Sequence, residues 1–398
     1  AMSATNKAAM SVSSTVPSSY TSTFVNFLYG DHSNEGVANP FRTRVDSAGA
    51  PFILGDFVNS NPVLVKNSFD GGYGGLGLGG ATGYQTFVAA KGAREATLFV
   101  GGNDGMLHAF RDSKGTTPST DGQEVFAYVP RAVYGNLYKL ADKTYGTGTL
   151  EHQYFVDGPQ RESDAFVKGP GTTIGTLAPS ASWRNYLTGS LGAGGKAVYA
   201  IDVTDAPNLK ASSIRWEISN TTAGASNLGY VLAPIEVGVL QDGKWVAIFG
   251  NGFASALGYA TLFVVDLETG AVTTLDVETS GLNGLGGVAV ARNASGQITN
   301  LYAGDLKGNL WKFDYNASAT SKFEVSGASA IFTAYNASSV PQPITQAPAI
   351  FKHSQGGNML VFGTGKLFET TDPAVTTTQS IYGVWDKPLD SIPRPLSR

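Results

Sequence analysis

Hydrophobic and polar positions alternate most regularly in residues 301–315, LYAGDLKGNLWKFDY. The apolar run LYAGD predicts one strand, and Lys307-Gly308 stands where a tight turn requires positive φ. Side chains of the second half, NLWKFDY, fall alternately on two faces. One of these faces carries Asn309, Trp311, Phe313 and Tyr315. The segment therefore predicts a β-hairpin.

The same hairpin pattern occurs earlier, in residues 98–110, LFVGGNDGMLHAF, with Asp104-Gly105 at the turn. Aligned without a gap, the two segments share five residues: Leu98/Leu301, Gly101/Gly304, Gly105/Gly308, Leu107/Leu310 and Phe110/Phe313. A hairpin repeated so far apart in one chain indicates an array of similar β units.

The rest of the chain is read mainly as short strands. Roughly fifteen to twenty-five strands are expected, with turn signals about every 8–12 residues. Short helices are expected at residues 20–30 and 131–142, where apolar residues have helical spacing. Strands are expected in residues 52–65, 97–110, 124–130, 152–156, 165–167, 183–187, 196–203, 213–218, 244–250, 261–267, 271–277, 301–315, 345–351, 358–363 and 380–386. The glycine-dense residues 71–83 are expected to form a loop.

This pattern predicts an all-β fold, a quinoprotein-like β-propeller of about seven blades with a few short helices in insertions. A pair of β-sandwiches is the rival, but it does not readily explain two matching hairpins far apart. Residues 1–19 are rich in Ala, Ser and Thr and are expected to be a flexible tail. Residues 20–398 are expected to form a single propeller domain that includes the N-terminal helical entry segment.

Composition narrows the possible partners. The net charge is −4 and no basic block runs along the chain, which argues against nucleic acid or an anionic membrane. The chain has no cysteine, which excludes disulfides and thiolate chemistry. No apolar run reaches about 18 residues, so no membrane span is expected. The start lacks a hydrophobic signal core, and we interpret Ala1-Met2 as a cloning scar on part of a longer precursor.

Several phrases, in this order, resemble one family: the C-terminal propeller domain of type IV pilus tip and biogenesis factors, the PilY or PilC proteins. They run from Val25 to Asp386 and so cover nearly the whole chain. The phrases are VNFLYGDHSNEGVANPFRTR, ILGDFVNSNPV, LFVGGNDGMLHAF, VPRAVYGNLYKL, YFVDG, VYAIDV, LFVVDLETG, LYAGDLKGNLWKFDY, VFGTGKLFE and SIYGVWD.

The resemblance implies a non-catalytic domain that promotes pilus assembly or counters retraction and supports adhesion and twitching motility. It implies minor pilins of the tip complex as partners, and a host or surface receptor bound through an N-terminal region that is absent here. It also implies export through the periplasm and outer membrane to the bacterial cell surface. Two alternatives remain: a quinoprotein dehydrogenase-like enzyme, and a propeller lectin or glycan-binding adhesin.

Many members of this family carry a calcium loop, D-x-[DN]-x-[DN]-G-x-x-D, just before the second hairpin. The corresponding window here, from Ala291 to Thr299, reads ARNASGQIT. It offers neutral oxygens from Asn293, Ser295, Thr299 and the Gln297 carbonyl but lacks every carboxylate. Because carboxylate ligands set calcium affinity, we expect a metal-free turn and no cofactor.

Other possible sites are read as structural, so no catalytic, cofactor or metal residue is expected. VFGTGKLF lacks the Ser/Thr and the following helix of a phosphate loop. The histidines, the strand-end aspartates and the tryptophans are expected to serve hydrogen bonding and packing. These residues are His32, His108, His152 and His353; Asp202, Asp266, Asp305 and Asp314; and Trp183, Trp216, Trp245, Trp311 and Trp385. Four N-x-[ST] triplets begin at Asn220, Asn293, Asn316 and Asn336. The loops at residues 71–83 and 189–195 are candidate partner surfaces.

Overall fold

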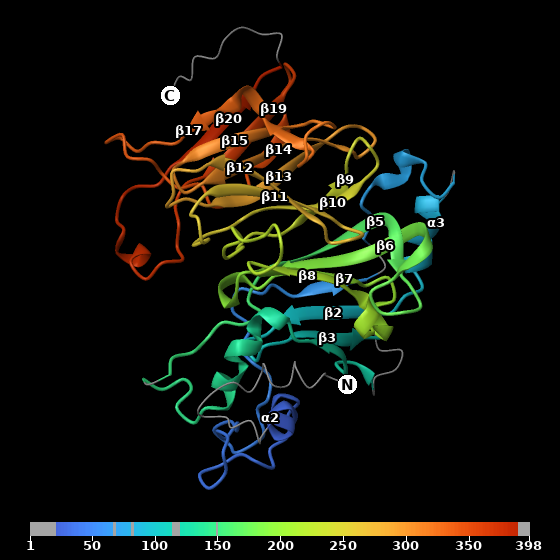
Figure 1. The fold of residues 1–398 in the computed structure, drawn as a ribbon, viewed down its shortest axis with the longest axis vertical. Coiled ribbons are helices and arrows are strands. Elements are labelled where there is room, and N and C mark those ends of the chain that lie inside the picture. Colours follow the sequence, from blue (N-terminus) through green and yellow to red (C-terminus); the bar gives the residue numbers. More distant parts are fainter. Residues whose placement is uncertain (1–20, 67–68, 81–82, 114–119, 149, 389–398) are drawn as a thin grey trace.

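A computed structural model describes residues 21–66, 69–80, 83–113, 120–148 and 150–388 (Figure 1). The predicted tail at residues 1–19 lies outside this described part. Among the described residues, strands β1 to β20 dominate and helices are short. The all-β prediction is confirmed, and the strand number falls within the expected range.

Five antiparallel sheets follow one another along the chain, each with its strands in sequence order. The first holds β1 (Val63–Val65), β2 (Ala96–Gly101), β3 (Leu107–Asp112) and β4 (Glu124–Tyr128). The second holds β5 (Gln160–Pro170), β6 (Leu177–Ser190), β7 (Ala197–Asp202) and β8 (Ile214–Ser219). The third holds β9 (Glu236–Val239), β10 (Trp245–Gly250), β11 (Ala260–Asp266) and β12 (Val272–Glu278). The fourth holds β13 (Leu285–Arg292), β14 (Ile298–Asp305), β15 (Asn309–Tyr315) and β16 (Phe323–Val325), with β17 (Phe332–Thr333) paired to β15. The fifth holds β18 (Ala349–Lys352), β19 (Asn358–Gly363) and β20 (Ile381–Asp386).

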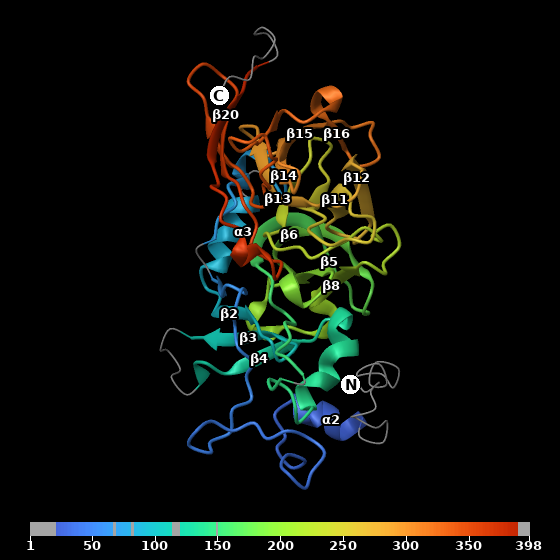
Figure 2. The same cartoon turned by 90° about the vertical axis from the view of Figure 1, so that its left-hand side faces the viewer.

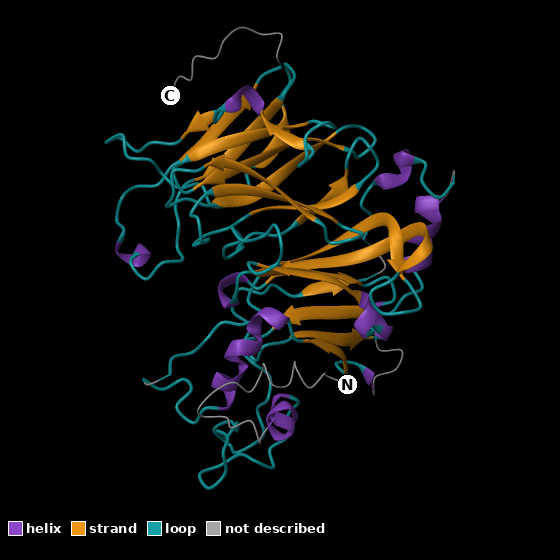
Figure 3. Ribbon diagram, in the orientation of Figure 1, coloured by secondary structure: helices purple, strands orange, loops and turns teal. Residues whose placement is uncertain are grey.

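The helical elements lie outside the sheets (Figure 3). The predicted first helix is α2 (Thr21–Leu28), and the second predicted helix is the 3-10 helix η4 (Arg131–Ala141). Helix α3 (Gly83–Lys91) was not predicted, because its apolar residues follow no clear amphipathic period. The remaining 3-10 turns are η2 (Tyr73–Leu76), η5 (Gly192–Gly194), η6 (Ala206–Asn208), η7 (Ala211–Ser213), η8 (Ser326–Ala328) and η9 (Asp372–Ala374).

The sheets are arranged radially, as in a propeller. The first strand of each sheet contacts the first strand of the next, in the series β1, β5, β9, β13 and β18. Apolar residues fill the space between successive sheets, so an inner sheet is buried on both faces. In β15, Trp311 and Phe313 pack with Leu262 of the third sheet, whereas Leu310 packs with Leu360 of the fifth. Side chains that alternate along β15 therefore point into two different apolar cores, one on each face of the sheet, and neither face is turned to solvent.

The expected number of about seven blades is wrong for the described chain, which has five sheets. Long segments that resemble strands in composition form loops and 3-10 turns instead. Of residues 52–65 only β1 is a strand, and residues 152–156 form none. In both views the first and fifth sheets lie on opposite sides of the second, third and fourth along the long axis, and α2 lies beyond the first sheet (Figures 1 and 2). The outer face of the fifth sheet leaves Phe351 and Ile381 exposed.

Helix α3 is anchored to the second sheet by a buried ion pair. The Lys91 ammonium lies 2.7 Å from an Asp164 carboxylate oxygen, and both side chains are buried. Asp164 also accepts hydrogen bonds from the Tyr84 hydroxyl at 2.8 Å and the Asn185 amide at 2.9 Å. The Lys91 ammonium also donates a hydrogen bond to the Phe69 carbonyl oxygen at 2.8 Å. A charge pair withdrawn from water is tolerated only when its polar atoms are satisfied in this way.

The hairpin predicted at residues 301–315 is formed by β14 and β15, with Leu301 opposite Phe313. Gly308 has φ 80°, and a Cβ there would lie 2.8 Å from the carbonyl oxygens of Ala334 and Gln342. The earlier hairpin is formed by β2 and β3, with Gly105 at φ 94°. Both glycines are therefore required by the turn conformation and by close neighbours.

Candidate functional site

One side of the molecule, which we call the loop face, collects two kinds of connection. These are the links between the second and third strands of a sheet, and the links from one sheet to the first strand of the next. Figure 3 shows loops along the left-hand side, opposite α3 and η2. Because antiparallel strands reverse direction at every turn, these two kinds of link must emerge at the same edge.

A hollow of about 970 Å³ opens on the loop face. Four of the five sheets contribute to it, through second-to-third links at Ala193, residues 253–258, Leu306, and Lys366 with Phe368 and Glu369. Sheet-to-sheet links add Tyr154, Tyr230, Leu232, residues 281–283 and Pro343. The hollow is therefore a shared feature of the propeller arrangement and does not belong to one sheet.

The rim of the hollow is apolar and exposed. Leu282 is 94% exposed and Leu257 is 51% exposed. Inside, Phe253 is buried and its ring stacks on Phe368 with 4.4 Å between centroids. Exposed leucines gathered around a concavity add nothing to the core of this chain, and such patches mark interaction sites.

Two lining residues also have strained backbones. Ala254 and Leu282 both have φ 54°, in the left-handed region that residues other than glycine and asparagine seldom adopt. The backbone at Leu282 is fixed by hydrogen bonds of the next residue, Asn283. Its amide nitrogen donates to Glu278 at 2.9 Å and to Asp305 at 3.1 Å. Strain kept in place by surrounding contacts is typical of functional sites.

Asp305 connects the hollow to the β14–β15 hairpin. Its carboxylate accepts hydrogen bonds from the backbone N–H groups of Lys307 and Asn309, each at 2.9 Å. It also accepts from the Trp311 indole N–H at 2.9 Å and from the Asn283 amide. One buried carboxylate therefore fixes the turn, the strand and the rim of the hollow.

The opposite wall is held by Asp372. It accepts backbone hydrogen bonds from Phe368 and Glu369, each at 2.9 Å, and lies 3.1 Å from the Lys366 ammonium. Burial lowers the pKa of Lys366, but hydrogen bonds to Glu369 and Asp372 outweigh this and raise it. The lysine is therefore a fixed cation at the edge of the hollow.

The lining suits binding better than catalysis. As far as the described residues go, it contains no histidine, and its one carboxylate, Glu369, is paired with Lys366. A general acid or base needs a group with a pKa matched to its task and held near a reacting atom. An apolar concavity with a few fixed polar groups instead recognises shape and apolar surface.

The window of the family calcium loop lies at the opposite end of the sheets, in the turn between β13 and β14. The Asn293 side-chain oxygen accepts from the backbone N–H groups of Ser295 and Gln297, each at 3.0 Å. Ala291 is buried among apolar residues, and Arg292 donates to the Val237 carbonyl oxygen at 2.8 Å. In the described chain, no cluster of three or more His, Cys, Asp or Glu could hold a metal ion.

Calcium is expected to leave the thermal stability of this protein unchanged. The loop presents neutral oxygens, and the Asn293 oxygen is already used by the turn. A site with a Kd of about 1 mM would add only about 0.4 kcal/mol at about 1 mM calcium, or about 1 °C in Tm. Thermal melts with calcium and with EDTA should agree within that limit. A rise of more than about 2 °C with calcium, but not with magnesium, would contradict this prediction.

The four histidines are dispersed, as their spacing predicts. His32 lies 3.0 Å from Glu35, His152 lies 2.9 Å from Asp56, and His353 stacks on Trp385. His108, which takes the place of Trp311 in the repeat, lies between two carboxylates. Its Nε2 is 3.0 Å from Asp104 and its Nδ1 is 2.5 Å from Glu124. Burial lowers the pKa of His108, but the two carboxylates outweigh this and raise it to about 9.

An alkaline loss of stability is expected from His108. Its pKa is about 9 in the folded protein and ordinarily 6.5, so the protonated form favours folding. This contribution, at most about 3 kcal/mol, is complete below pH 6.5 and is lost as the pH rises to 9. Denaturant unfolding across this pH range should show the loss, and a His108→Gln variant should show a smaller one. His353→Gln is the control, and equal slopes in wild type and His108→Gln would refute the assignment.

The other residues singled out from the sequence have structural roles in the described chain. Trp183 and Trp245 pack around Tyr73, so this residue anchors the described part of the glycine-rich segment, residues 71–80, to the second and third sheets. Three N-x-[ST] asparagines accept a hydrogen bond from the backbone N–H of the serine two residues later. These are Asn293, Asn316 and Asn336, and such turns are a common use of asparagine.

Sequence reasoning missed the hollow itself. The sequence VFGTGKLF predicts only a β-turn, because it lacks the features of a phosphate-binding loop. In the structure, however, its Lys366 and Phe368 line the hollow. A usable signal was present: apolar residues stand inside turn segments, at Leu257, Leu282 and Leu367, where polar residues are usual. The segments containing them are far apart in sequence, so their convergence required the topology.

Five antiparallel sheets of three to five strands, packed face to face around their first strands, define a β-propeller domain. The family model of the PilY1 beta-propeller domain matches residues 54–391. The chain belongs to this family.

Individual relatives agree. The type IV pilus biogenesis factor PilY1 of Pseudomonas aeruginosa (strain PAK) is 38% identical over 387 residues, which cover 91% of this chain and 30% of that protein. A PilY1 homolog of Xylella fastidiosa (strain Temecula1) is 34% identical over 389 residues, covering 91% and 24%. The crystal structure of the Pseudomonas aeruginosa PilY1 C-terminal domain matches with a TM-score of 0.61 and 35% identity, covering 77% of this chain and 60% of that one. The chain thus spans less than a third of these curated relatives.

Proposed function

We propose that this chain is the propeller domain of a type IV pilus biogenesis factor and acts by binding, without catalysis. Membership of the PilY1 propeller family supports the biological role. One observation supports the mode of action: the apolar hollow on the loop face, with exposed leucines on a strained backbone. Minor pilins of the pilus tip are the proposed partners, and the bacterial cell surface is the proposed location.

The charge and hydrophobicity of the chain are consistent with a role in pilus assembly. The net charge of −4 with no basic block does not favour nucleic acid. No helix in the described part of the chain is long and apolar enough to cross a membrane. Nothing in the site favours the quinoprotein dehydrogenase or the lectin. Four tryptophans are buried in packing and the fifth, Trp385, donates to the Gly356 carbonyl oxygen.

The decisive substitution is Leu282→Asp in the full-length protein. Leu282 is nearly free of contacts and has positive φ, which aspartate tolerates, so folding should be unaffected. A carboxylate at the rim would have to be desolvated when an apolar partner binds. We expect capture of minor pilins to weaken about tenfold or more, with fewer surface pili.

The matched control is Ile174→Asp. Ile174 is 73% exposed, but it lies in the β5–β6 turn, away from the loop face. This variant should capture minor pilins and assemble pili like the wild type. If Leu282→Asp also behaves like the wild type in both assays, the hollow is not the docking surface.

A further inference from the structure

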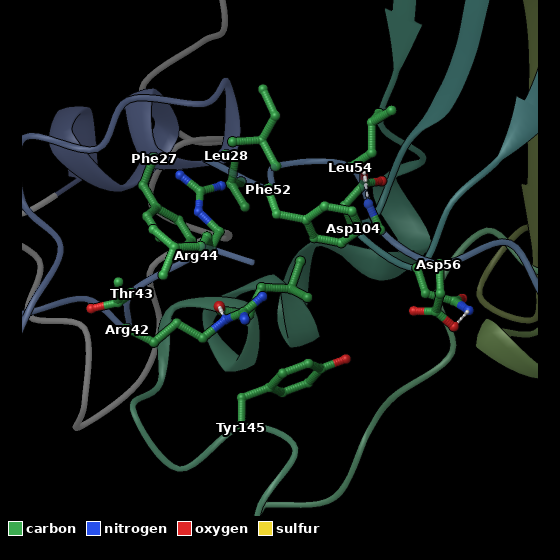
Figure 4. Close-up of a pocket in the computed structure, with 15 residues that line it drawn as sticks. Phe27, Leu28, Arg42, Thr43, Arg44, Phe52, Leu54, Asp56, Asp104 and Tyr145 are labelled. Atoms are coloured by element: carbon green, nitrogen blue, oxygen red, sulfur yellow. Dashed lines mark hydrogen bonds between the residues drawn. The ribbon is translucent and has the colours of Figure 1, made fainter. Parts of the chain in front are cut away.

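A second cavity on the loop face, of about 240 Å³, lies between the N-terminal segment and the tip of the β2–β3 hairpin (Figure 4). The N-terminal segment contributes Arg42, Phe52 and Leu54. The β2–β3 tip contributes Asp104, and the β4–β5 link contributes Tyr145. We call it the Arg42 pocket. It is smaller than the roughly 300–1,000 Å³ typical of sites that enclose a whole small-molecule ligand.

Two arginines line this pocket, and they are used differently. Arg44 is buried, and its guanidinium lies 2.7 Å from Glu35 and 3.6 Å from the centroid of the Phe27 ring. It also donates to the Asp31 carbonyl oxygen. Arg44 thus holds the N-terminal segment together through its Nε and one terminal nitrogen.

Arg42 has spare donors. Its Nε donates to the Leu140 carbonyl oxygen at 2.5 Å, and its guanidinium lies 5.1 Å from the centroid of the Tyr145 ring. Within the described chain neither terminal nitrogen has a hydrogen bond, and no carboxylate pairs with this arginine. Figure 4 shows the guanidinium between Phe52 and Tyr145, facing the cavity. The two terminal N–H groups of an arginine form a fork that fits one carboxylate.

The carboxylates across the pocket do not supply that partner. Asp104 lies 3.0 Å from His108 and accepts from the Gly55 N–H at 2.8 Å. Asp56 lies 2.9 Å from His152 and accepts from the Asn103 amide. Neither acid lies within ion-pair distance of Arg42, which leaves Arg42 as the charge of the pocket without an ion-pair partner in the described residues.

The wall beside Arg42 is apolar and open to solvent. Phe52 is 62% exposed, and Val45 and Leu54 are also exposed. A bound group that satisfies this pocket must carry a negative charge and an apolar side chain close together. The last residue of a peptide carries both on one Cα, and a small cavity accommodates a chain end more readily than a continuing strand.

We propose that the Arg42 pocket binds the C-terminal carboxylate of a peptide whose last side chain is apolar. The Arg42 fork holds the carboxylate, and the side chain packs on Phe52 and Leu54. This goes beyond the docking role of the hollow and does not depend on it, because the two sites share no lining residue.

The test uses the 398-residue chain and three peptides in calorimetric titrations. The first is acetyl-Gly-Ser-Gly-Leu with a free carboxylate, the second is its C-terminal amide, and the third is acetyl-Gly-Asp-Gly-Leu-amide. We expect the free acid to bind about tenfold or more tightly than either amide. In Arg42→Gln the free acid should bind no better than the amide. Arg131→Gln, which removes the same charge from the exposed start of η4, should behave like the wild type.

Three results would overturn the proposal. The first is equal binding of the free acid and its amide to the wild-type protein, a comparison that does not depend on whether a variant folds. Equal binding of the third peptide would assign the pocket to acidic side chains instead. Absence of binding by any peptide would also reject it. Minor-pilin capture by Arg42→Gln is measured separately, so failure here and failure of the hollow are distinguishable.

Discussion

An Asp164→Ala variant will lose about 3–5 kcal/mol of unfolding free energy, because it leaves the Lys91 ammonium buried without its counter-charge. Both side chains are removed from water, and their oxygen and nitrogen atoms lie 2.7 Å apart. The loss also leaves the Tyr84 hydroxyl without its acceptor and removes the shorter of the two hydrogen bonds that the Asn185 amide donates. Urea unfolding followed by tryptophan fluorescence should report it, since Trp183 packs on Tyr84 with 4.4 Å between ring centroids.

The double variant Lys91→Met/Asp164→Leu separates charge burial from packing. It replaces both charged groups by apolar ones of similar size, and such replacements are often neutral. We expect it to recover most of the stability lost in Asp164→Ala. If the single variant unfolds at the same urea concentration as the wild type, the ion pair does not hold α3 on the second sheet.

An Asp305→Ala variant will lose a comparable amount, about 3–5 kcal/mol, because several buried donors lose one acceptor together. The Trp311 indole N–H and the Asn283 amide are both buried and both donate to this carboxylate. Because Asn283 supports the segment that carries Leu282, minor-pilin capture should weaken as well. Stability is measured by denaturant unfolding, and capture is measured below the temperature at which the variant begins to unfold.

Asp266→Ala is the matched control for this prediction. Asp266 also ends a strand and accepts from the backbone N–H groups of Glu268 and Thr269 in its turn. That turn is half-exposed, so water can replace the lost acceptor, and a loss of only about 1 kcal/mol is expected. Equal losses in the two variants would show that Asp305 acts only as a local turn residue.

Much of the sheet structure could be predicted because it depends on local pattern. Turn glycines and period-two alternation located β14–β15 and β2–β3 correctly, and the gapless match between them anticipated related units. The strand-end aspartates were also interpreted correctly as turn acceptors at Asp202, Asp266 and Asp305. Asp314 is different, because it accepts from Asn300 on the neighbouring strand.

What could not be predicted depends on packing between distant segments. Helix α3 lacks a clear apolar stripe because its buried side includes Lys91, whose partner lies 73 residues away. The number of sheets was overestimated because about seven four-stranded blades fit the chain length, whereas long stretches such as residues 52–62 and 152–156 form links of the loop face. Arg42 and Arg44 look equivalent in the sequence, and only the structure shows which one has spare donors.

The separate apolar cores between successive sheets imply a particular response to tension. Each sheet is stabilised by packing only against its neighbours. A tensile force along the long axis therefore acts on every core between successive sheets, and the weakest core separates first. In the described residues the core between the fourth and fifth sheets is the smallest, and it includes Leu310, Leu360 and Phe362. It should yield first. Because Lys366 and Phe368 follow the fifth sheet's second strand, that yielding would pull one wall away from the hollow, so a partner docked there would be released at high load.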